Sequence, residues 1–192
     1  MNVIFHTTTA IGVAVLLTNT RTVGTTPAIK EVMPTALSAF GVGIISHGIL
    51  DFIPHCYPIN SKLDVIAGLA IILLTTWICN PQYRAVVGFS FFGCIFPDLF
   101  DLGPKILNKQ LSLGLTIYEN VFPWHWYNYS GSIYSGDCVV STVNHFLLIF
   151  TLAIIFWTRR RQLKNIFAKN RHHDITDCPT QPKSQFRGKE LS

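Results

Sequence analysis

The most regular pattern in the chain is a series of five apolar segments separated by polar breaks. The segments cover residues 3–18, 32–53, 63–79, 85–102 and 138–157. Each is close to the roughly 20 residues that a helix needs to cross about 30 Å of hydrocarbon. Turn-forming residues such as Pro54, Pro58 and Pro81 fall between them, and a long connection covers residues 103–137. The pattern predicts an all-α fold: a polytopic integral membrane helical bundle with about five transmembrane helices.

The composition favours a membrane protein over a soluble domain. Hydrophobic residues make up 49% of the 192 residues, charged residues only 13%, and the mean hydropathy is +0.36. The formal charge of +5 is concentrated at the end of the chain, because nine of the fifteen Lys and Arg residues follow Thr158. Residues 1–158 carry six basic and seven acidic groups, so we predict no nucleic-acid partner. We expect a transmembrane helical domain over residues 1–157 and a basic, largely disordered tail over residues 158–192.

A basic cluster directly after the last apolar segment predicts the orientation. Residues 159–161 are all arginine, which is typical of the cytoplasmic side of a membrane helix. With a cytoplasmic tail, counting the spans places the amino terminus and the connections 54–62 and 103–137 on the outer side. We expect the chain in the bacterial inner (plasma) membrane, with membrane lipids as its partners.

Nearly every ionisable residue inside an apolar segment is a His or an Asp near the predicted outer end of that segment. These residues are His6, His47, Asp51, Asp98, Asp101 and His145. Ionisable side chains are costly in hydrocarbon, so they usually mark a pathway, a pair or a metal site. His47 and Asp51 are spaced i and i+4 and share one helix face, where a nitrogen and an oxygen can reach the same cation.

Short motifs surround these residues. They are Phe-His-Thr-Thr-Thr-Ala-Ile-Gly from residue 5, Ser-His-Gly-Ile-Leu-Asp from residue 46, Gly-Cys-Ile-Phe-Pro-Asp-Leu-Phe-Asp from residue 93 and Asn-His-Phe from residue 144. This set resembles the YdjM-type family of membrane-bound metal-dependent hydrolases over about residues 1–155, although the family's Thr-His-Ser triplet is replaced by Ser46-His47-Gly48. A more remote similarity is to the zinc-dependent phospholipase C and nuclease group. The resemblance implies that His6, His47, Asp51, Asp98 and Asp101 occupy the family's polar site positions, with His145 less closely aligned.

We interpret these residues as one open metal site. The expected ligands of a divalent cation, Zn or Mn, are His6, His47, Asp51 and Asp98. We expect catalytic roles for Asp101 and His145, because a group that does not bind the metal must handle a proton. The structural interpretation stays open for each residue: a hydrogen-bonded His–Asp pair between helices, or a helix end that reaches headgroup water.

The predicted outer connections hold two further features. Residues 122–129 concentrate aromatic side chains, which indicates either an interfacial aromatic anchor or a lid that places His125 near the bond to be cleaved. Cys56 and Cys138 both fall on the outer side of the predicted map and could pair, although their spacing does not establish a disulfide.

The features above predict a membrane-bound metal-dependent hydrolase that acts on a lipid or other membrane-borne ester or phosphoester. Two alternatives remain. A small ion-coupled transporter would also carry His and Asp residues in its helices, but near the midplane. A non-enzymatic scaffold or assembly protein would need them only for helix packing.

Overall fold

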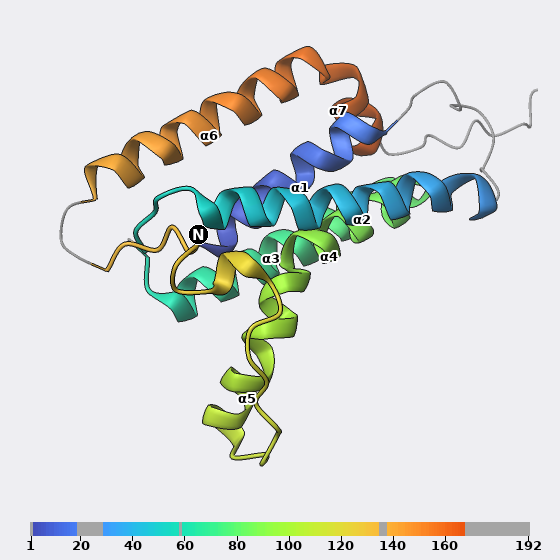
Figure 1. Ribbon diagram of the computed structural model, residues 1–192. Coiled ribbons are helices and arrows are strands. Elements are labelled where there is room, and N and C mark those ends of the chain that lie inside the picture. The colour runs from blue at the N-terminus through green and yellow to red at the C-terminus, as the bar shows by residue number, and fades with distance from the viewer. Residues whose placement is uncertain (1, 19–28, 58, 135–137, 168–192) are drawn as a thin grey trace, which may run out of the picture.

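The structure is built from helices that follow the predicted apolar segments. The computed structural model describes residues 2–18, 29–57, 59–134 and 138–167. The long helices are α1 (Val3–Leu17), α2 (Ile29–Phe52), α3 (Ser61–Ile78), α4 (Arg84–Asp101) and α6 (Val139–Thr158); the short ones are α5 (Gly103–Leu111), α7 (Arg160–Phe167) and the 3-10 turns η2 (Pro81–Tyr83) and η3 (Pro123–His125) (Figure 1). No β-strand occurs within the described residues, which confirms the all-α prediction.

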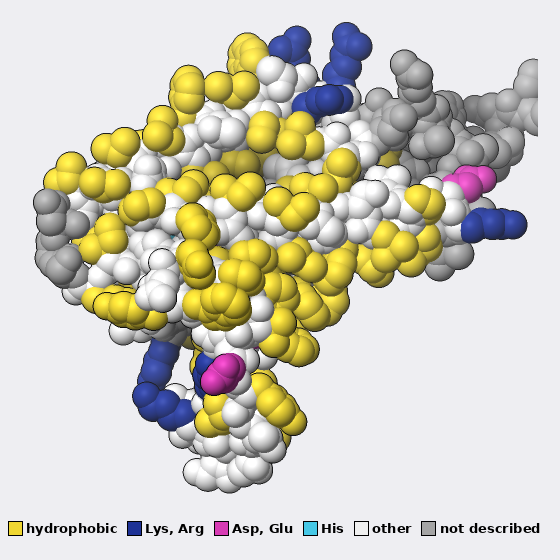
Figure 2. Space-filling view, viewed as in Figure 1, with side chains coloured by type: hydrophobic (Ala, Val, Ile, Leu, Met, Phe, Trp, Pro, Cys, Tyr) yellow, Lys and Arg dark blue, Asp and Glu magenta, His cyan; other side chains and the backbone are white. Residues whose placement is uncertain are grey.

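Four helical segments are long and apolar enough to cross a membrane: residues 30–52 of α2, all of α3, η2 with α4, and α6. The first predicted span, α1, is apolar but has only 15 residues. Large apolar side chains face outward, as Leu73 and Trp77 of α3 are 71% and 76% exposed and Phe146 of α6 is 69% exposed. Hydrophobic side chains are spread over the helices in Figure 2. Such a surface suits hydrocarbon and not water, as expected of an integral membrane protein.

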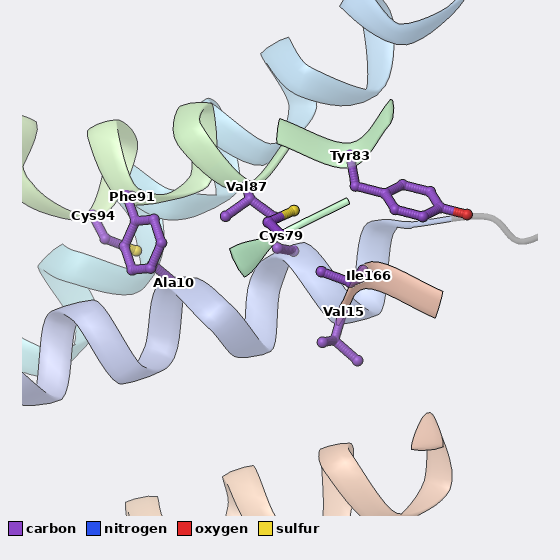
Figure 3. Close-up of a cluster of buried hydrophobic side chains, with 9 residues drawn as sticks. Ala10, Val15, Cys79, Tyr83, Val87, Phe91, Cys94 and Ile166 are labelled. Carbon is purple, nitrogen blue, oxygen red and sulfur yellow. The ribbon is translucent and has the colours of Figure 1, made fainter. Parts of the chain in front are cut away.

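The apolar core forms where α1 and α4 pack together. Ala10, Val15, Val87 and Phe91 are buried there, and Figure 3 shows them with Ile166 from α7. The backbone also joins α7 to the connection between α3 and η2, because Asn80 N–H donates to the carbonyl of Ile166 at 2.8 Å. Residues 160–167, which the sequence analysis assigned to the tail, therefore form a helix that packs on the bundle. Residues 168–192, the rest of the predicted disordered tail, lie outside the described residues.

Two glycines allow the backbones of α2 and α4 to touch. A Cβ atom on Gly93 would lie 2.2 Å from the carbonyl oxygen of Phe40, and one on Gly43 would lie 2.9 Å from the nitrogen of Cys94. Small residues at such a crossing let two helices approach more closely than larger side chains permit. His47 lies one turn beyond Gly43, so the close crossing brings its ring against α4.

The start of α1 is held by a carboxylate of α3. Asp64, which is buried, accepts hydrogen bonds from the backbone N–H groups of Val3 at 2.7 Å and Ile4 at 3.1 Å. A carboxylate at this position caps free amide groups and complements the positive end of the helix dipole. This contact places His6, in the first turns of α1, beside the ends of α2 and α4.

The connection after α2 and the connection before α6 are tied to each other and to the end of α2. Cys56 and Cys138 form a disulfide, so the pairing that the sequence left open does occur. Gly131 donates its N–H to the carbonyl of Asp51 and accepts from His55 N–H, both at 2.8 Å. A Cβ atom on Gly131 would lie 2.3 Å from the carbonyl oxygen of Ile53, so only glycine fits this approach. The connection that contains η3 is therefore docked against the bundle.

Candidate metal centre

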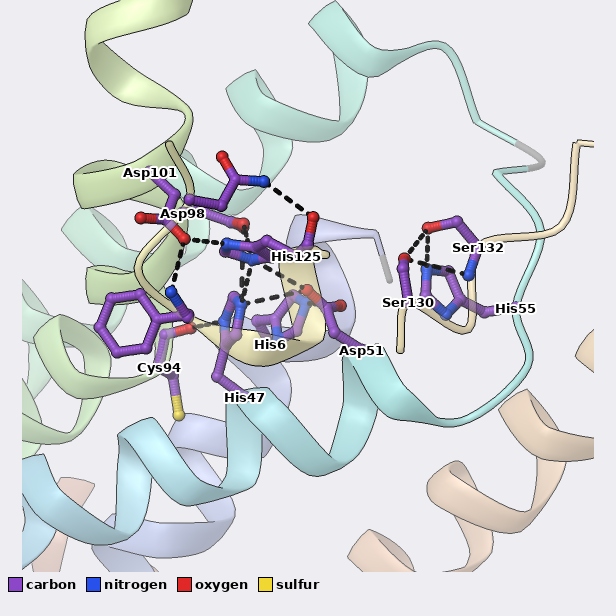
Figure 4. Close-up of polar contacts among 12 residues, drawn as sticks. His6, His47, Asp51, His55, Cys94, Asp98, Asp101, His125, Ser130 and Ser132 are labelled. Atoms are coloured by element: carbon purple, nitrogen blue, oxygen red, sulfur yellow. Dashed lines mark hydrogen bonds and ion pairs between the residues drawn. The ribbon is translucent and has the colours of Figure 1, made fainter. Parts of the chain in front are cut away.

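Four side chains from three elements converge at one end of the bundle. His47 and Asp51 come from α2, Asp98 from α4 and His125 from η3. Each offers a nitrogen or oxygen atom, and these atoms all lie within 4.8 Å of one another. Figure 4 shows their polar ends turned toward a common centre. This group could hold a metal ion.

Five of the six separations within the group are close to those of a metal coordination shell. Asp51 Oδ2 lies 3.1 Å from His47 Nε2 and 3.4 Å from His125 Nε2. Asp98 Oδ1 lies 3.6 Å from His47 Nε2 and 3.2 Å from His125 Nε2, and the two Nε2 atoms are 3.4 Å apart. Zinc–ligand bonds of about 2.0–2.1 Å in a tetrahedron put neighbouring ligand atoms about 3.3 Å apart. The five distances cluster around that value.

In both histidines, Nδ1 points away from the centre and makes a hydrogen bond that determines the tautomer of the neutral ring. His47 Nδ1 lies 2.6 Å from the carbonyl oxygen of Cys94, and a carbonyl oxygen only accepts, so Nδ1 carries the hydrogen. His125 Nδ1 donates in the same way to Asp101 Oδ2 at 2.8 Å. In the neutral rings Nε2 is then an acceptor. Such outer contacts are typical of histidines that bind metals.

Asp101 lies behind His125 and not at the centre. Its side chain is 1% exposed. Its Oδ1 accepts from Val121 N–H at 2.9 Å and its Oδ2 from Phe122 N–H at 3.0 Å, in addition to His125. The sequence analysis gave Asp101 a catalytic role, whereas the structure places it where it holds the loop and orients the His125 ring.

His6 lies next to the group through Asp51. Its Nε2 is 3.1 Å from Asp51 Oδ1, whereas His47 Nε2 lies 3.1 Å from the other oxygen, Oδ2. Its ring stacks on that of His47 with centroids 4.1 Å apart, and His6 is 1% exposed. Its Nδ1 has no hydrogen-bond partner among the described residues. The predicted ligand His6 therefore contacts a ligand oxygen but is not one of the four convergent residues.

His145 is not brought to this group. Its ring stacks on Phe5, with centroids 4.2 Å apart, and its Nε2 has no hydrogen-bond partner in the part of the chain described. By contrast, His125, which the sequence analysis left outside the ligand set, is at the centre. The only sequence signal for His125 was its place in the aromatic connection on the predicted outer side.

Three carboxylates next to His125 determine the direction in which its pKa shifts. Burial alone would lower the pKa of the imidazole, but hydrogen bonds to Asp51, Asp98 and Asp101 outweigh it and raise the pKa to about 10. The centre therefore attracts positive charge, either as a proton on His125 or as a metal ion.

A cavity opens beside the group. It has a volume of about 510 Å³ and is lined by Asp51, Asp98 and His125 together with side chains of α3 and α4. The side chain of Asp98 is 29% exposed, whereas that of His47 is fully buried. The group is thus closed on the side of the bundle and open on the side of Asp98, as in sites that leave a position for water or substrate.

The fold and the site define a class: a polytopic helical membrane protein with a His/Asp group at one end that could hold a metal ion. No family model matches the chain, and no curated protein or solved structure is similar enough to it to count as a match.

Proposed function

We propose that this protein is a membrane-bound metal-dependent hydrolase that acts on a lipid or other membrane-borne ester or phosphoester. The observation that carries the proposal is the meeting of two imidazole nitrogens and two carboxylates at one centre. His47 and His125 donate their Nδ1 hydrogens elsewhere, so in the neutral rings two Nε2 lone pairs would face the carboxylates of Asp51 and Asp98. With both rings neutral, these four groups at 3.1–3.6 Å would repel one another unless a cation lay between them.

Zinc or manganese is the proposed ion. Two imidazole nitrogens and two carboxylate oxygens suit both metals, and the separations fit tetrahedral zinc. The thiols of free Cys79 and Cys94 are buried and are not among the four convergent groups, so the donor set is not that of a closed cysteine-rich zinc site.

A divalent cation held here would supply Lewis acidity toward an ester or phosphoester oxygen and would acidify a water molecule. The chain's own residues have distinct tasks. His47 is fixed by the carbonyl of Cys94, and His125 by Asp101. Asp98, the most exposed member, lies at the opening, where its second carboxylate oxygen would take a proton from the attacking water. Asp101 acts through His125 as a positioning residue.

We propose that the site lies at the outer face of the bacterial inner membrane and that the tail lies in the cytoplasm. The disulfide between Cys56 and Cys138 lies at the same end as the site, and disulfides persist in oxidising compartments such as the periplasm. Arg159, Arg160 and Arg161 follow α6 at its other end, where the positive-inside rule expects them. The resemblance to YdjM-type hydrolases supports the same assignment.

The proposal is tested by metal analysis of the detergent-purified protein, with His47→Ala, His125→Ala and His145→Ala prepared in parallel. Wild type and His145→Ala should carry near-stoichiometric Zn or Mn, whereas the other two variants should lose it while remaining folded. The metal-loaded wild type should then hydrolyse phosphoester or lipid ester substrates. A folded wild type that takes up neither metal, or metal that persists in both ligand variants, would overturn the proposal.

One observation favours a second function, a scaffold without metal. With a pKa of about 10, His125 would be an imidazolium at neutral pH and would hold the carboxylates of α2 and α4 together on its own. His125→Lys keeps a positive charge but lacks the imidazole ligand. In a scaffold this variant should retain stability, whereas in the hydrolase it should lose metal and activity.

A further inference from the structure

The cavity beside the candidate metal centre has two chemically different ends. Asp98 and His125 line one end. An apolar part of the wall includes Val65, Leu69 and Ile72 of α3 with Ile95 and Leu99 of α4. Polar side chains, Ser61, Asp64, Ser130 and Ser132, also line the cavity. A single cavity therefore connects the acidic group to a hydrocarbon-like surface.

The apolar wall follows the axis of α3. Val65, Leu69 and Ile72 are spaced i, i+4 and i+7, so they form one stripe on a helix face. Val65 and Leu69 are 44% and 50% exposed, so the stripe is accessible from the side of the bundle. The seven residue steps extend about 10 Å along the helix. That is the length of roughly eight methylene groups joined by bonds of about 1.5 Å.

The cavity is also lined by an amide that has no partner among the described residues. Asn2 lines the cavity and is 1% exposed, yet neither its amide nitrogen nor its amide oxygen has a hydrogen-bond partner among the described residues. Buried amides are almost always hydrogen-bonded, so an unpartnered one beside a cavity indicates a ligand or water that completes it. Asn2 offers both a donor and an acceptor to a polar head.

We infer that the cavity binds a membrane amphiphile with one linear alkyl chain, which lies along the stripe of Val65, Leu69 and Ile72. Its ester or phosphoester head then lies at Asp98 and His125. The inference rests on the proposed function for the chemistry at the head and adds the substrate class. Such a molecule would enter from the bilayer, because the stripe is half exposed on the side of the bundle. The core between α1 and α4 is buried and offers no route.

The test is photolabelling of the full-length protein in lipid nanodiscs. The probe is an octyl phosphate with a diazirine near the end of its chain, and labelled peptides are identified by mass spectrometry. Leu69→Trp fills the stripe, and Leu73→Trp is the matched control, because Leu73 is 71% exposed and does not line the cavity. Metal content is measured on the same samples. Labelling of α6, which is exposed to lipid, reports nonspecific contact.

Labelling should concentrate on residues 65–72 and 95–106 in wild type and Leu73→Trp, and excess unlabelled octylphosphonate should remove it. Leu69→Trp should reduce it at least fivefold without changing the metal content or the labelling of α6. Labelling of the stripe no stronger than that of α6, or unaffected by Leu69→Trp, would overturn the inference even if metal is bound. Specific labelling of a protein that binds no metal would support the amphiphile site and overturn only the hydrolase proposal.

Discussion

Nδ1 of His125 donates a hydrogen bond of 2.8 Å to Asp101, and the same carboxylate accepts the backbone N–H groups of Val121 and Phe122. One buried acid therefore does two things: it shapes the loop and it turns Nε2 of His125 toward the centre. His125 comes from neither α2 nor α4 but from η3, and it lies 24 residues further along the chain than Asp101.

Asp101→Asn should weaken metal binding about 10- to 100-fold, because the amide lacks the charge that holds the His125 tautomer. The affinity is measured by competition with a chromophoric chelator. Glu119→Gln is the control, since it removes an exposed carboxylate from the same connection. Equal affinities in wild type and Asp101→Asn would mean that Asp101 has no part in orienting the ligand.

The second prediction concerns the close crossing of α2 and α4. Gly93→Ala should destabilise the protein by about 1–3 kcal/mol, because the new methyl group would lie 2.2 Å from the Phe40 carbonyl oxygen and must push the helices apart. Metal affinity should fall with it, since His47 reaches α4 across this crossing. Thermal unfolding in detergent and chelator competition measure the two effects.

Gly88→Ala is the matched control for that variant. It lies on the same helix, and nothing lies within 4 Å of the added Cβ. We expect it to leave metal affinity unchanged and to raise stability slightly, by about 0.5–1 kcal/mol, because alanine is the better helix former. A Gly93→Ala protein as stable as Gly88→Ala would contradict the close-packing argument.

The apolar segments predicted the helices well because length and hydrophobicity alone decide whether a segment spans a membrane. His47 and Asp51 could be paired from their i, i+4 spacing, and counting the spans put Asp98 at the same end. His125 could not be found in this way, because its position depends on Asp101 and on the glycine contact at residue 131, which are tertiary contacts without a local pattern. His145 lies in a segment that is apolar on every side, so its sequence gives no indication of which face meets the bundle.

The disulfide between Cys56 and Cys138 supplies a third prediction. Its reduction should lower stability by about 2–4 kcal/mol, because it closes a long loop of the unfolded chain. It should also weaken metal binding, since the connection that carries His125 is hydrogen-bonded beside it at His55 and Gly131. Melting temperature and metal affinity are compared with and without reductant.

The double variant Cys56→Ser with Cys138→Ser is the control for reagent effects. It should behave like the reduced wild type and should not respond to reductant. If reduction changes neither quantity in the wild type, the link does not support the site.

Proton release on metal binding supplies the last prediction. The pKa of His125 is raised from 6.5 to about 10, so in metal-free protein near pH 8 the ring carries a proton that a metal ion must displace. Between about pH 7 and pH 10 the apparent affinity should therefore rise close to tenfold per pH unit, then level off as His125 loses its proton unaided. In the metal-free protein the His125 ion pairs stabilise the fold fully below about pH 6.5, and this contribution is lost as the pH rises through about 10. Calorimetric titrations at pH 8 in two buffers of different ionisation enthalpy count the released protons, and Asp101→Asn, which removes one of the three carboxylates, should release fewer. Binding without proton release, or affinity independent of pH over this range, would show that His125 is neutral before the metal arrives.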